Sequence, residues 1–402
     1  MSEPAAAAPA AAASASSGGS SPCMHDARVA QPVSAHAPPL VACSPSASAG
    51  SSSAPAAAEA TKTTSPVVEA DYGPASDLSP CASPDTDPTH RFYYIGYGSN
   101  MLPSMLLLKK VHVHSSRRVI LHDVELLFDL AVKSLVEPSY ANLRRHPAGS
   151  GHETHGIMYE LESRDMLTMD RVEGNGRSYV REEFQAELYE EEVDTALQQL
   201  PEGVVTVRTG SDGRRHATVT ASAYICHPNN LSRLVLKDTP PSRRYLDVLI
   251  AGARYHKLRP EYIAKLEVHP ATPLPKLEFT AEQLRAIEAR TYTEAELAAG
   301  GWRDYMANMP PEQWPDPLLI ALRGIVFDVR HSPYASSWKQ ANGGKCMTLF
   351  TAGRVATDCV SIPTELEHLG PEHKAYVNAT LVDWARSYII MGHMEDRGKY
   401  DF

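Results

Sequence analysis

The stretch YYIGYGSNM, residues 93–101, decides how this chain is expected to fold. Its first five positions are aromatic or apolar, which is typical of a buried strand. The run stops at Gly98, Ser99 and Asn100, residue types that favour turns and helix caps, and a helix-like segment, MLPSMLLLKK, follows. Such a turn directs backbone N–H groups and a helix N-terminus to one place, where they can bind an anion or stabilise an oxyanion. Taken alone, the pattern is more often a simple helix cap.

The residues before this stretch differ from the rest of the chain in composition. Residues 1–90 are rich in Ala, Ser and Pro, and carry eight acidic residues against two basic ones. They cannot bury enough apolar surface to offset the entropy of ordering, so we predict a disordered tail. The tail also lacks the Leu-rich or Arg-rich pattern of a targeting peptide. It accounts for six of the ten net negative charges, and the remainder gives no reason to expect a nucleic-acid partner.

Apolar runs and cysteines bear on the location of the protein. The best candidate for a membrane span, PLLIALRGIVFDV, is interrupted by Arg323, so no span is predicted. Three of the six cysteines, Cys226, Cys346 and Cys359, lie beyond the tail, and there is no CxxC pair. This usage fits a reducing compartment, and we predict a cytoplasmic protein. The oligomeric state does not follow from the sequence.

The folded part is expected to contain two domains. Residues 91–270 alternate between strand-like segments and helical pieces without a strict βαβ order, which indicates a mixed α/β, barrel-like domain with helices on its flank. Residues 271–279, ATPLPKLEF, form a Pro-rich linker. Residues 280–402 form a second, small α+β domain.

A second feature concerns Glu173 in the segment SRDMLTMDRVEGNG. Met166, Met169 and Glu173 lie at positions i, i+3 and i+7, so the carboxylate shares the apolar face of a helix. Gly174 ends that helix directly after it. Burial and the negative end of the helix dipole both disfavour the charged carboxylate, so a raised pKa is expected. Such a group suits a general base that must also act as an acid.

Together these motifs resemble those of the gamma-glutamylcyclotransferase family. The likeness covers residues 91–270. It is carried by YIGYGSN at 94–100, SYAN at 139–142, DRVEG at 170–174, PSRRY at 241–245 and LRPEY at 258–262. The resemblance implies conversion of an L-gamma-glutamyl amino acid into 5-oxoproline and a free amino acid, without a cofactor.

The resemblance also implies roles for individual residues. Glu173 would be the catalytic acid/base. The implied substrate-binding residues are Tyr94, Ile95, Gly96, Tyr97, Gly98, Ser99, Asn100 and Tyr245. Asn100, where glutathione-specific members carry Leu, favours a gamma-glutamyl dipeptide over glutathione. The alternative is a non-catalytic protein that binds a small molecule in the same pocket and at the C-terminal domain, although a retained buried acid argues against lost turnover.

The second domain is similar to the cytochrome b5-like heme/steroid-binding family, in its membrane-associated progesterone receptor branch. The likeness is carried by YTEAEL at 292–297, IALRGIVFDV at 320–329 and FTAGRVA at 350–356. The family's heme-ligating Tyr is expected a few residues before Phe350, but it is missing here, and Cys346 and Met347 occupy that region. A buried Cys is more often a small core residue than a heme ligand. We therefore predict no stoichiometric heme in this domain.

Two pairs of histidines are candidate metal ligands. His112 and His114 would share one face of a strand, and His152 and His155 are also close in sequence. Neither pair has a Cys or a third His at a recognised zinc spacing. The sequence therefore predicts no metal site.

Overall fold

The computed structural model describes most of the chain from His90 onward. The described residues are 90–174, 178–211, 213–226, 235–303, 306, 309, 313–332, 342–355 and 363–402. The predicted disordered tail, apart from His90, lies outside the described residues. In the described part of the chain, every helix is too short or too polar to cross a membrane.

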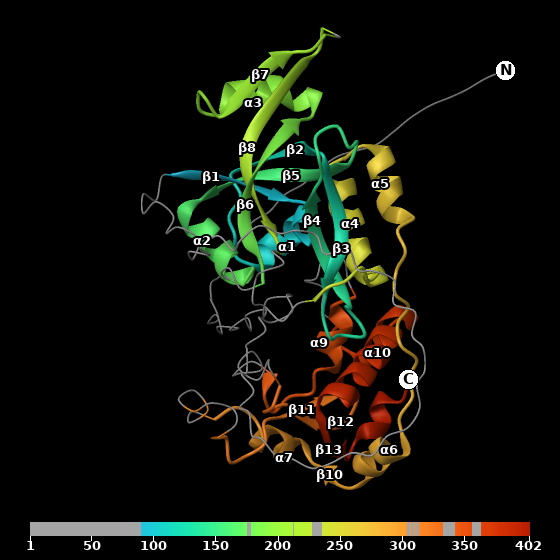
Figure 1. The fold of residues 1–402 in the computed structure, drawn as a ribbon. Helices are drawn as coiled ribbons and strands as arrows, with labels where there is room; N and C mark the ends of the chain where they lie inside the picture. Colours follow the sequence, from blue (N-terminus) through green and yellow to red (C-terminus); the bar gives the residue numbers. More distant parts are fainter. Residues whose placement is uncertain are drawn as a thin grey trace, which may run out of the picture. The chain divides into compact units, whose positions relative to one another are not determined.

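The first folded region is built around a closed barrel of five strands (Figure 1). The strands pair in the order β1, β5, β2, β6, β8, and a parallel contact between Tyr94 and Ser222 joins β8 to β1. The strands are β1 (Arg91–Gly96), β2 (Ser115–His122), β5 (Glu153–Glu162), β6 (Val180–Leu188) and β8 (Arg215–Ile225). This arrangement confirms the mixed α/β, barrel-like architecture predicted for this region.

The segment RRVILHDVELLFDLAV, residues 117–132, is divided between two strands, β2 and β3 (Val124–Ala131). The chain turns at Asp123, which has a positive φ of 57°, and its carboxylate accepts hydrogen bonds from the backbone of Gly149 and Ser150 at 3.0 and 2.8 Å. β2 therefore stays in the barrel, whereas the following strand enters a second sheet. That sheet has the order β4 (Ser139–Arg145), β3 (Val124–Ala131), β9 (Val235–Leu236).

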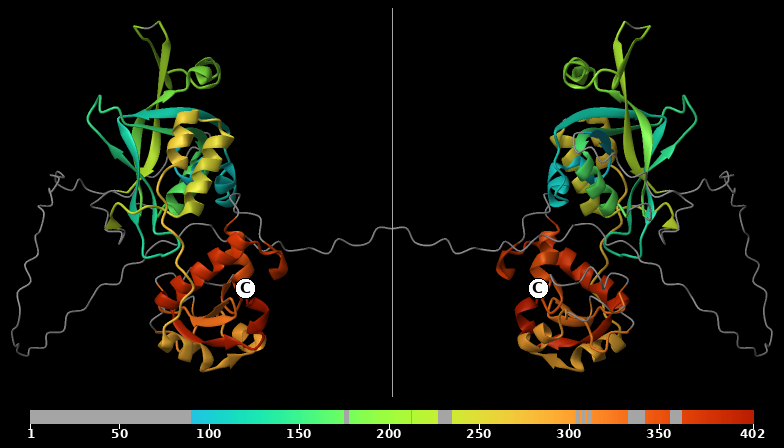
Figure 2. Two further views of the ribbon diagram at one scale, coloured as in Figure 1. Left: turned by 90° about the vertical axis from the view of Figure 1, so that its right-hand side faces the viewer. Right: turned by 90° about the vertical axis from the view of Figure 1, so that its left-hand side faces the viewer.

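One hairpin extends away from the barrel. β7 (Val205–Thr209) pairs with the N-terminal half of β8. α3 (Val193–Gln199), which follows the short 3-10 helix η2 (Glu190–Glu192), lies beside this hairpin in both views of the molecule (Figures 1 and 2).

Helices cover the barrel and place the residues of interest. They are the 3-10 helix η1 (Ser99–Met101), α1 (Pro103–Leu108), α2 (Ser163–Val172), α4 (Arg243–Tyr255) and α5 (Pro260–Glu267). Tyr245, Val248 and Leu249 lie on one buried face of α4. Gly252 on this face lets α4 approach closely, since a Cβ there would lie 2.8 Å from the backbone of Met101 and Leu102.

The second folded region is a sheet of four strands covered by helices. The sheet order is β10 (Thr291–Tyr292), β13 (Ile389–Met394), β12 (Ile325–Asp328), β11 (Leu319–Leu322). The helices are α6 (Ala281–Glu288), α7 (Glu294–Ala299), α9 (Thr348–Gly353), α10 (Pro371–Ser387), η5 (Leu366–His368) and η6 (Arg397–Tyr400). The finer resemblance to a cytochrome b5-like domain stays a prediction.

Candidate active site

The turn after β1 differs from the simple helix cap that its sequence suggests. Gly98 leads into the 3-10 helix η1, whose hydrogen bonds run from Met101 N to Gly98 O and from Leu102 N to Ser99 O, both at 3.0 Å. The α-helix begins only at Pro103, which lacks an N–H and suits the first turn. The predicted helix N-terminus therefore does not lie directly at the turn.

The side chain of Asn100 instead points inward and joins three other side chains. Its Nδ2 donates to the Tyr94 hydroxyl at 2.6 Å and lies 3.2 Å from Glu173 Oε1. Its Oδ1 accepts a hydrogen bond of 2.6 Å from Lys109 Nζ. We call Tyr94, Asn100, Lys109 and Glu173 the Glu173 cluster. Two predicted motifs, YGSN and DxxEG, meet in this cluster although they lie 73 residues apart in the chain.

Glu173 occupies the position that its helical spacing predicted. It is the C-cap of α2, whose residues Met166 and Met169 are fully buried, and its own side chain is 10% exposed. Gly174 follows with a φ of +96°, which is favourable for glycine at the end of a helix. Asn175 and Gly176 lie outside the described residues. The helix thus holds a carboxylate at its buried end.

Lys109 is the functional candidate that sequence reasoning missed. Its ammonium group lies 2.8 Å from Glu173 Oε1, and its side chain is only 2% exposed. Burial lowers the pKa of Lys109, and the nearby Glu173 carboxylate opposes that effect. One signal was present in the sequence, because Lys109 follows the buried Met105 by four positions, a spacing that places both on one helical face.

The lysine changes the electrostatic environment expected of Glu173. The sequence suggested burial and a helix dipole, which disfavour a charged carboxylate, whereas a neighbouring ammonium favours it. Both partners are almost completely removed from water, so each depends on the other for compensation of its charge. The raised pKa expected for Glu173 stays a prediction.

Asp170 fixes the end of the helix that carries Glu173. This buried residue accepts a hydrogen bond of 2.7 Å from the Tyr224 hydroxyl, and Arg181 Nε lies 3.5 Å from the same oxygen. Tyr224 and Arg181 belong to barrel strands β8 and β6. The aspartate of the DxxEG motif therefore anchors α2 to the barrel.

Tyr245 lies where four segments meet. Its hydroxyl accepts a hydrogen bond of 3.3 Å from Ala141 N and also interacts with the Ser99 side chain, while burial raises its pKa to about 12. A Cβ on Gly98 would lie 3.3 Å from the Tyr245 oxygen. The Tyr179 hydroxyl donates to Ala141 O at 3.0 Å. Four segments thus converge on Ala141: the end of β1, strand β4, the segment before β6, and helix α4.

The other predicted binding residues are used mainly within the fold. Ile95 is fully buried in the core, and a Cβ on Gly96 would lie 3.1 Å from the Asn100 backbone. The Tyr97 hydroxyl donates to the carbonyl of Tyr224. Ile95, Gly96 and Tyr97 therefore shape the turn, whereas Gly98, Ser99 and Asn100 reach the neighbourhood of Tyr245 or Glu173.

The structure separates the two histidines of the HETH segment. His155 is buried, its Nδ1 lies 2.5 Å from the Tyr189 hydroxyl, and its ring stacks on Tyr262. His152 stacks instead on His146, with ring centroids 4.0 Å apart. The two members of this pair consequently have different partners.

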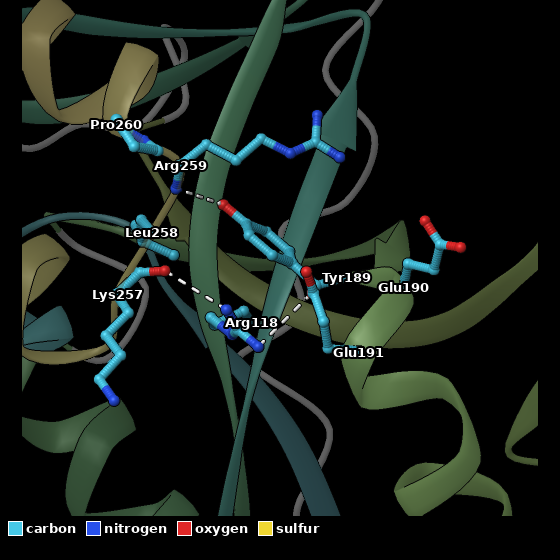
Figure 3. A pocket seen from close by; sticks show the side chains of 8 residues that line it. All are labelled: Arg118, Tyr189, Glu190, Glu191, Lys257, Leu258, Arg259 and Pro260. Atoms are coloured by element: carbon cyan, nitrogen blue, oxygen red, sulfur yellow. Dashed lines mark hydrogen bonds and ion pairs between the residues drawn. The ribbon is translucent and has the colours of Figure 1, made fainter.

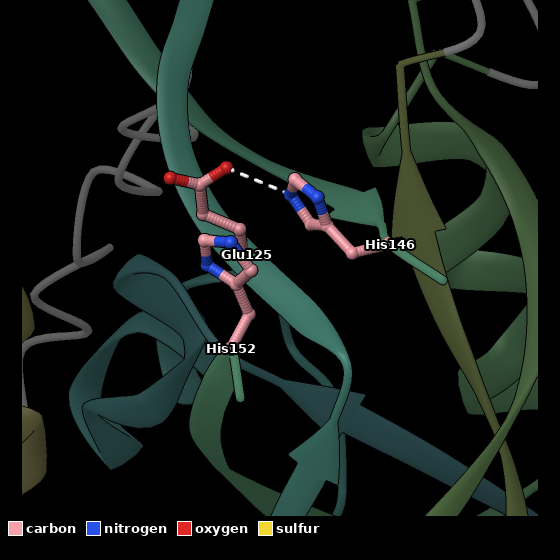
Figure 4. Close-up of side chains that lie close together, drawn as sticks. All are labelled: Glu125, His146 and His152. Carbon is pink, nitrogen blue, oxygen red and sulfur yellow. Dashed lines mark hydrogen bonds and ion pairs between the residues drawn. The ribbon is translucent and has the colours of Figure 1, made fainter. Parts of the chain in front are cut away.

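His152 belongs to a different group, with Glu125 and His146 (Figure 4). His146 Nε2 lies 2.9 Å from Glu125 Oε2, and the two imidazole planes are inclined by only 18°. A single ion needs the in-plane lone pairs of both rings to converge, but lone pairs of nearly parallel stacked rings do not. The arrangement is that of a hydrogen-bonded Glu–His pair with a stacked imidazole.

A shallow pocket of about 190 Å³ is separate from the Glu173 cluster (Figure 3). Its lining residues are Arg118, Tyr189, Glu190, Glu191, Lys257, Leu258, Arg259 and Pro260. The Arg118 guanidinium lies over the Tyr189 ring and pairs with Glu192 at 2.7 Å. Because cationic and anionic groups line it together, the pocket indicates no particular ligand charge.

Comparison with known proteins gives one sequence-level match. The family model described as "Gamma-glutamyl cyclotransferase, AIG2-like" matches residues 94–245, which is less than half of the chain. None of the curated proteins matches the chain. The matched segment begins at Tyr94, ends at Tyr245 and contains the Glu173 cluster.

Solved structures show a more distant likeness. An uncharacterized protein from Homo sapiens and a structure named gamma-glutamyl cyclotransferase are each 20% identical, with 48% of this chain and 95% of theirs covered, at a TM-score of 0.33. A gamma-glutamyl cyclotransferase specific to glutathione from yeast is 17% identical, with 44% of this chain and 93% of that chain covered, at a TM-score of 0.33. The sequence similarity to the gamma-glutamyl cyclotransferase family over residues 94–245 rests on the family model.

Proposed function

We propose that residues 91–270 form a gamma-glutamylcyclotransferase, which converts an L-gamma-glutamyl amino acid into 5-oxoproline and the free amino acid. The observation that carries the proposal is the distance of 3.2 Å between Asn100 of the YGSN turn and Glu173. The match of a gamma-glutamyl cyclotransferase family model over residues 94–245 supports it. In this proposal the substrate itself provides the nucleophile.

The reaction needs one group that accepts and then returns a proton. The substrate's alpha-amine, which is an ammonium at neutral pH, loses a proton to Glu173 and attacks the gamma-carbonyl carbon. A C–N bond forms to close the ring, and the original amide C–N bond breaks. Glu173 then delivers the proton to the leaving nitrogen, and the second proton that the ring nitrogen loses on becoming an amide passes to the released amine. Ring closure is intramolecular, so correct folding of the bound substrate supplies roughly several kcal/mol of the barrier reduction.

Lys109 and Asn100 would prepare Glu173 for the first of these steps. The Lys109 ammonium group favours the carboxylate form, which is the form that accepts a proton. Asn100 bonds to Lys109 and lies beside Glu173, and so restrains both side chains. The acid/base would therefore be held in one charge state and one orientation before substrate arrives.

The residues around Ala141 would hold the glutamyl part of the substrate. The Tyr245 hydroxyl is buried and remains protonated at neutral pH, since its pKa is raised to about 12. It can therefore donate a hydrogen bond to a carbonyl or carboxylate oxygen. Gly98 allows the backbone to approach this hydroxyl closely.

The test is release of 5-oxoproline by the full-length protein. Gamma-glutamyl-alanine, gamma-glutamyl-lysine isopeptide and glutathione are supplied in parallel, and 5-oxoproline is quantified by mass spectrometry. We expect release from gamma-glutamyl-alanine in preference to glutathione, and loss of release in Glu173→Gln.

A binding measurement separates the proposal from its alternative. If the protein binds gamma-glutamyl compounds but releases no 5-oxoproline from any of them, the non-catalytic binding role replaces the enzymatic one. Equal release by wild type and Glu173→Gln would instead exclude Glu173 as the acid/base.

A further inference from the structure

A loop of the first folded region contacts the last helix of the second. Leu135 N and Ser134 Oγ, which follow β3, donate hydrogen bonds of 2.9 and 3.0 Å to the two carboxylate oxygens of Asp383 on α10. Val136 packs in a small buried apolar cluster with Tyr376 and Ala379 of the same helix. The β3–β4 loop, residues 132–138, is therefore tied to α10 by polar and apolar contacts.

Glu137 of this loop connects α10 to the start of α4. Its side chain is 6% exposed, and its carboxylate accepts hydrogen bonds from Ser242 Oγ at 2.5 Å, from the Tyr376 hydroxyl at 3.3 Å and from Arg244 Nε. Arg244 in turn donates to the carbonyl of Arg354 at 3.0 Å. A buried carboxylate is costly unless its oxygens are satisfied, and α10 supplies one of the three donors.

The same contacts reach Tyr245 within three residues. Ser242 is the N-cap of α4, and its Oγ accepts a hydrogen bond of 3.0 Å from Tyr245 N. Glu137 thus orients the Ser242 hydroxyl, which caps the first turn of α4, and that turn carries Tyr245. The Tyr245 hydroxyl then bonds to Ala141 N, three residues after the β3–β4 loop ends.

We propose that α10 of the C-terminal region positions Tyr245 at the candidate active site, through Glu137 and the N-cap Ser242. Tyr376 and Asp383 are positioning residues in this proposal, since they act through the loop and touch no substrate. The consequence for substrate binding rests on the proposed cyclotransferase function, whereas the mechanical connection to α4 does not. The C-terminal region would accordingly be part of the working enzyme.

Two variants of the full-length protein interrupt the connection. Tyr376→Phe removes the hydroxyl donor to Glu137, and Asp383→Asn weakens the acceptor for Leu135 N and Ser134. Matched controls are Tyr292→Phe and Asp328→Asn, which alter a buried tyrosine and a buried aspartate of the same region away from this loop. Each control reports the effect of disturbing the C-terminal region in general.

The first readout is hydrogen exchange of the backbone amides at residues 242–246. Loss of one or two hydrogen bonds from the network should accelerate exchange at this turn about threefold to tenfold. We expect acceleration in Tyr376→Phe and Asp383→Asn, and none in the two controls. Unchanged exchange in both test variants would overturn the proposal whatever the activity of the protein.

The second readout is steady-state kinetics of 5-oxoproline release. A displaced Tyr245 should raise KM about threefold to tenfold and change kcat less than twofold, because Tyr245 binds substrate and transfers no proton. A merely structural defect would reduce the amount of active enzyme and lower kcat at constant KM. That outcome, or equal KM changes in the controls, would contradict the proposal. Altered exchange without any 5-oxoproline release would leave α10 connected to α4 and reject only the cyclotransferase function.

Discussion

Two carboxylates, the part-buried Glu173 in the first folded region and the buried Asp328 in the second, obtain their hydrogen bonds in different ways. Asp328 accepts from Arg330 N and Leu318 N, which lie two and ten residues away in the chain. Glu173 contacts Lys109 and Asn100, which lie 64 and 73 residues away. A carboxylate that bonds to its own hairpin stabilises that hairpin, whereas one that gathers groups from distant segments forms a site.

The surroundings of the two carboxylates differ in the same sense. Asp328 also pairs with a cation, but that cation is Arg330, only two residues away in the chain, at 2.8 Å. Near Glu173, an ammonium, an amide and a tyrosine hydroxyl share the interior. Such buried polar groups cost free energy unless all are satisfied, which favours a functional rather than a stabilising role for the Glu173 cluster.

The largest expected effect concerns these two carboxylates directly. Glu173→Gln should reduce 5-oxoproline release by roughly 10²–10⁴-fold, because an amide cannot accept and return the proton. The amide oxygen can still accept the hydrogen bond from Lys109, but the Lys109 charge loses its compensation, so the free energy of unfolding should also fall. Turnover of gamma-glutamyl-alanine by the purified full-length variant gives the measurement.

The control for this prediction is Asp328→Asn. It should leave turnover within about twofold of wild type and lower only the free energy of unfolding, by about 1–3 kcal/mol for a weakened buried acceptor. A comparable loss of turnover in both variants would mean that contacts to distant segments do not distinguish a functional carboxylate from a structural one.

The second prediction concerns the buried ion pair of the cluster. Lys109→Met should lower the free energy of unfolding by about 3–5 kcal/mol, because it leaves the Glu173 carboxylate buried without its cation. The double variant Lys109→Met/Glu173→Gln should recover part of that loss. Urea unfolding of the wild type, both single variants and the double variant completes a double-mutant cycle.

An exposed pair in the second region provides the contrast. Arg397 and Glu288 are also 2.8 Å apart, but their side chains are 37% and 61% exposed. Arg397→Met should therefore cost only about 0–1 kcal/mol. For the buried pair, simple addition of the two single-variant changes in unfolding free energy in the double variant would show that Lys109 and Glu173 are not coupled.

The third prediction uses His155, buried between barrel and helix in the first region. Burial is the main cause that lowers its pKa from 6.5 to about 4, and Arg259 adds to the effect. Between those values the unfolded chain binds more protons, so stability is complete above pH 6.5 and is lost as pH falls towards 4. The shift corresponds to roughly 3 kcal/mol.

Urea unfolding between pH 7.5 and pH 4.5 checks this prediction. His155→Gln should show a smaller loss of stability over that range than wild type, by roughly 2–3 kcal/mol. Parallel pH profiles for wild type and His155→Gln would contradict the assignment.

The smallest expected effect concerns heme and the second region. We predict that hemin added to the full-length protein gives no saturable Soret band at one heme per chain. The Cys346 Sγ lies 3.2 Å from the Thr348 hydroxyl, and the backbone of Cys346 forms a bridge with Ala321. The thiol is therefore packed at the margin of the sheet. A stoichiometric band that disappears in Cys346→Ala would show a thiolate-ligated heme instead.

Several elements followed from the sequence because local patterns specify them. The strand expected at residues 93–97, observed as Arg91–Gly96, and the position of Glu173 at the end of α2 depend on spacing and on turn residues close by in the chain. The closed barrel was predicted only in general terms. Its closure depends on the contact between Tyr94 and Ser222, which no local pattern encodes.

Only the tertiary structure decided which charges meet. Lys109 reads in the sequence as one of two lysines at a helix end, yet folding places its ammonium group against Glu173. The two histidines of HETH have different partners, because His155 lies within β5 whereas His152 lies before that strand begins. Local spacing fixes the face on which a side chain lies, but its partner depends on how distant segments pack. The sequence therefore determined Glu173 as the candidate acid, and the tertiary structure determined its cation.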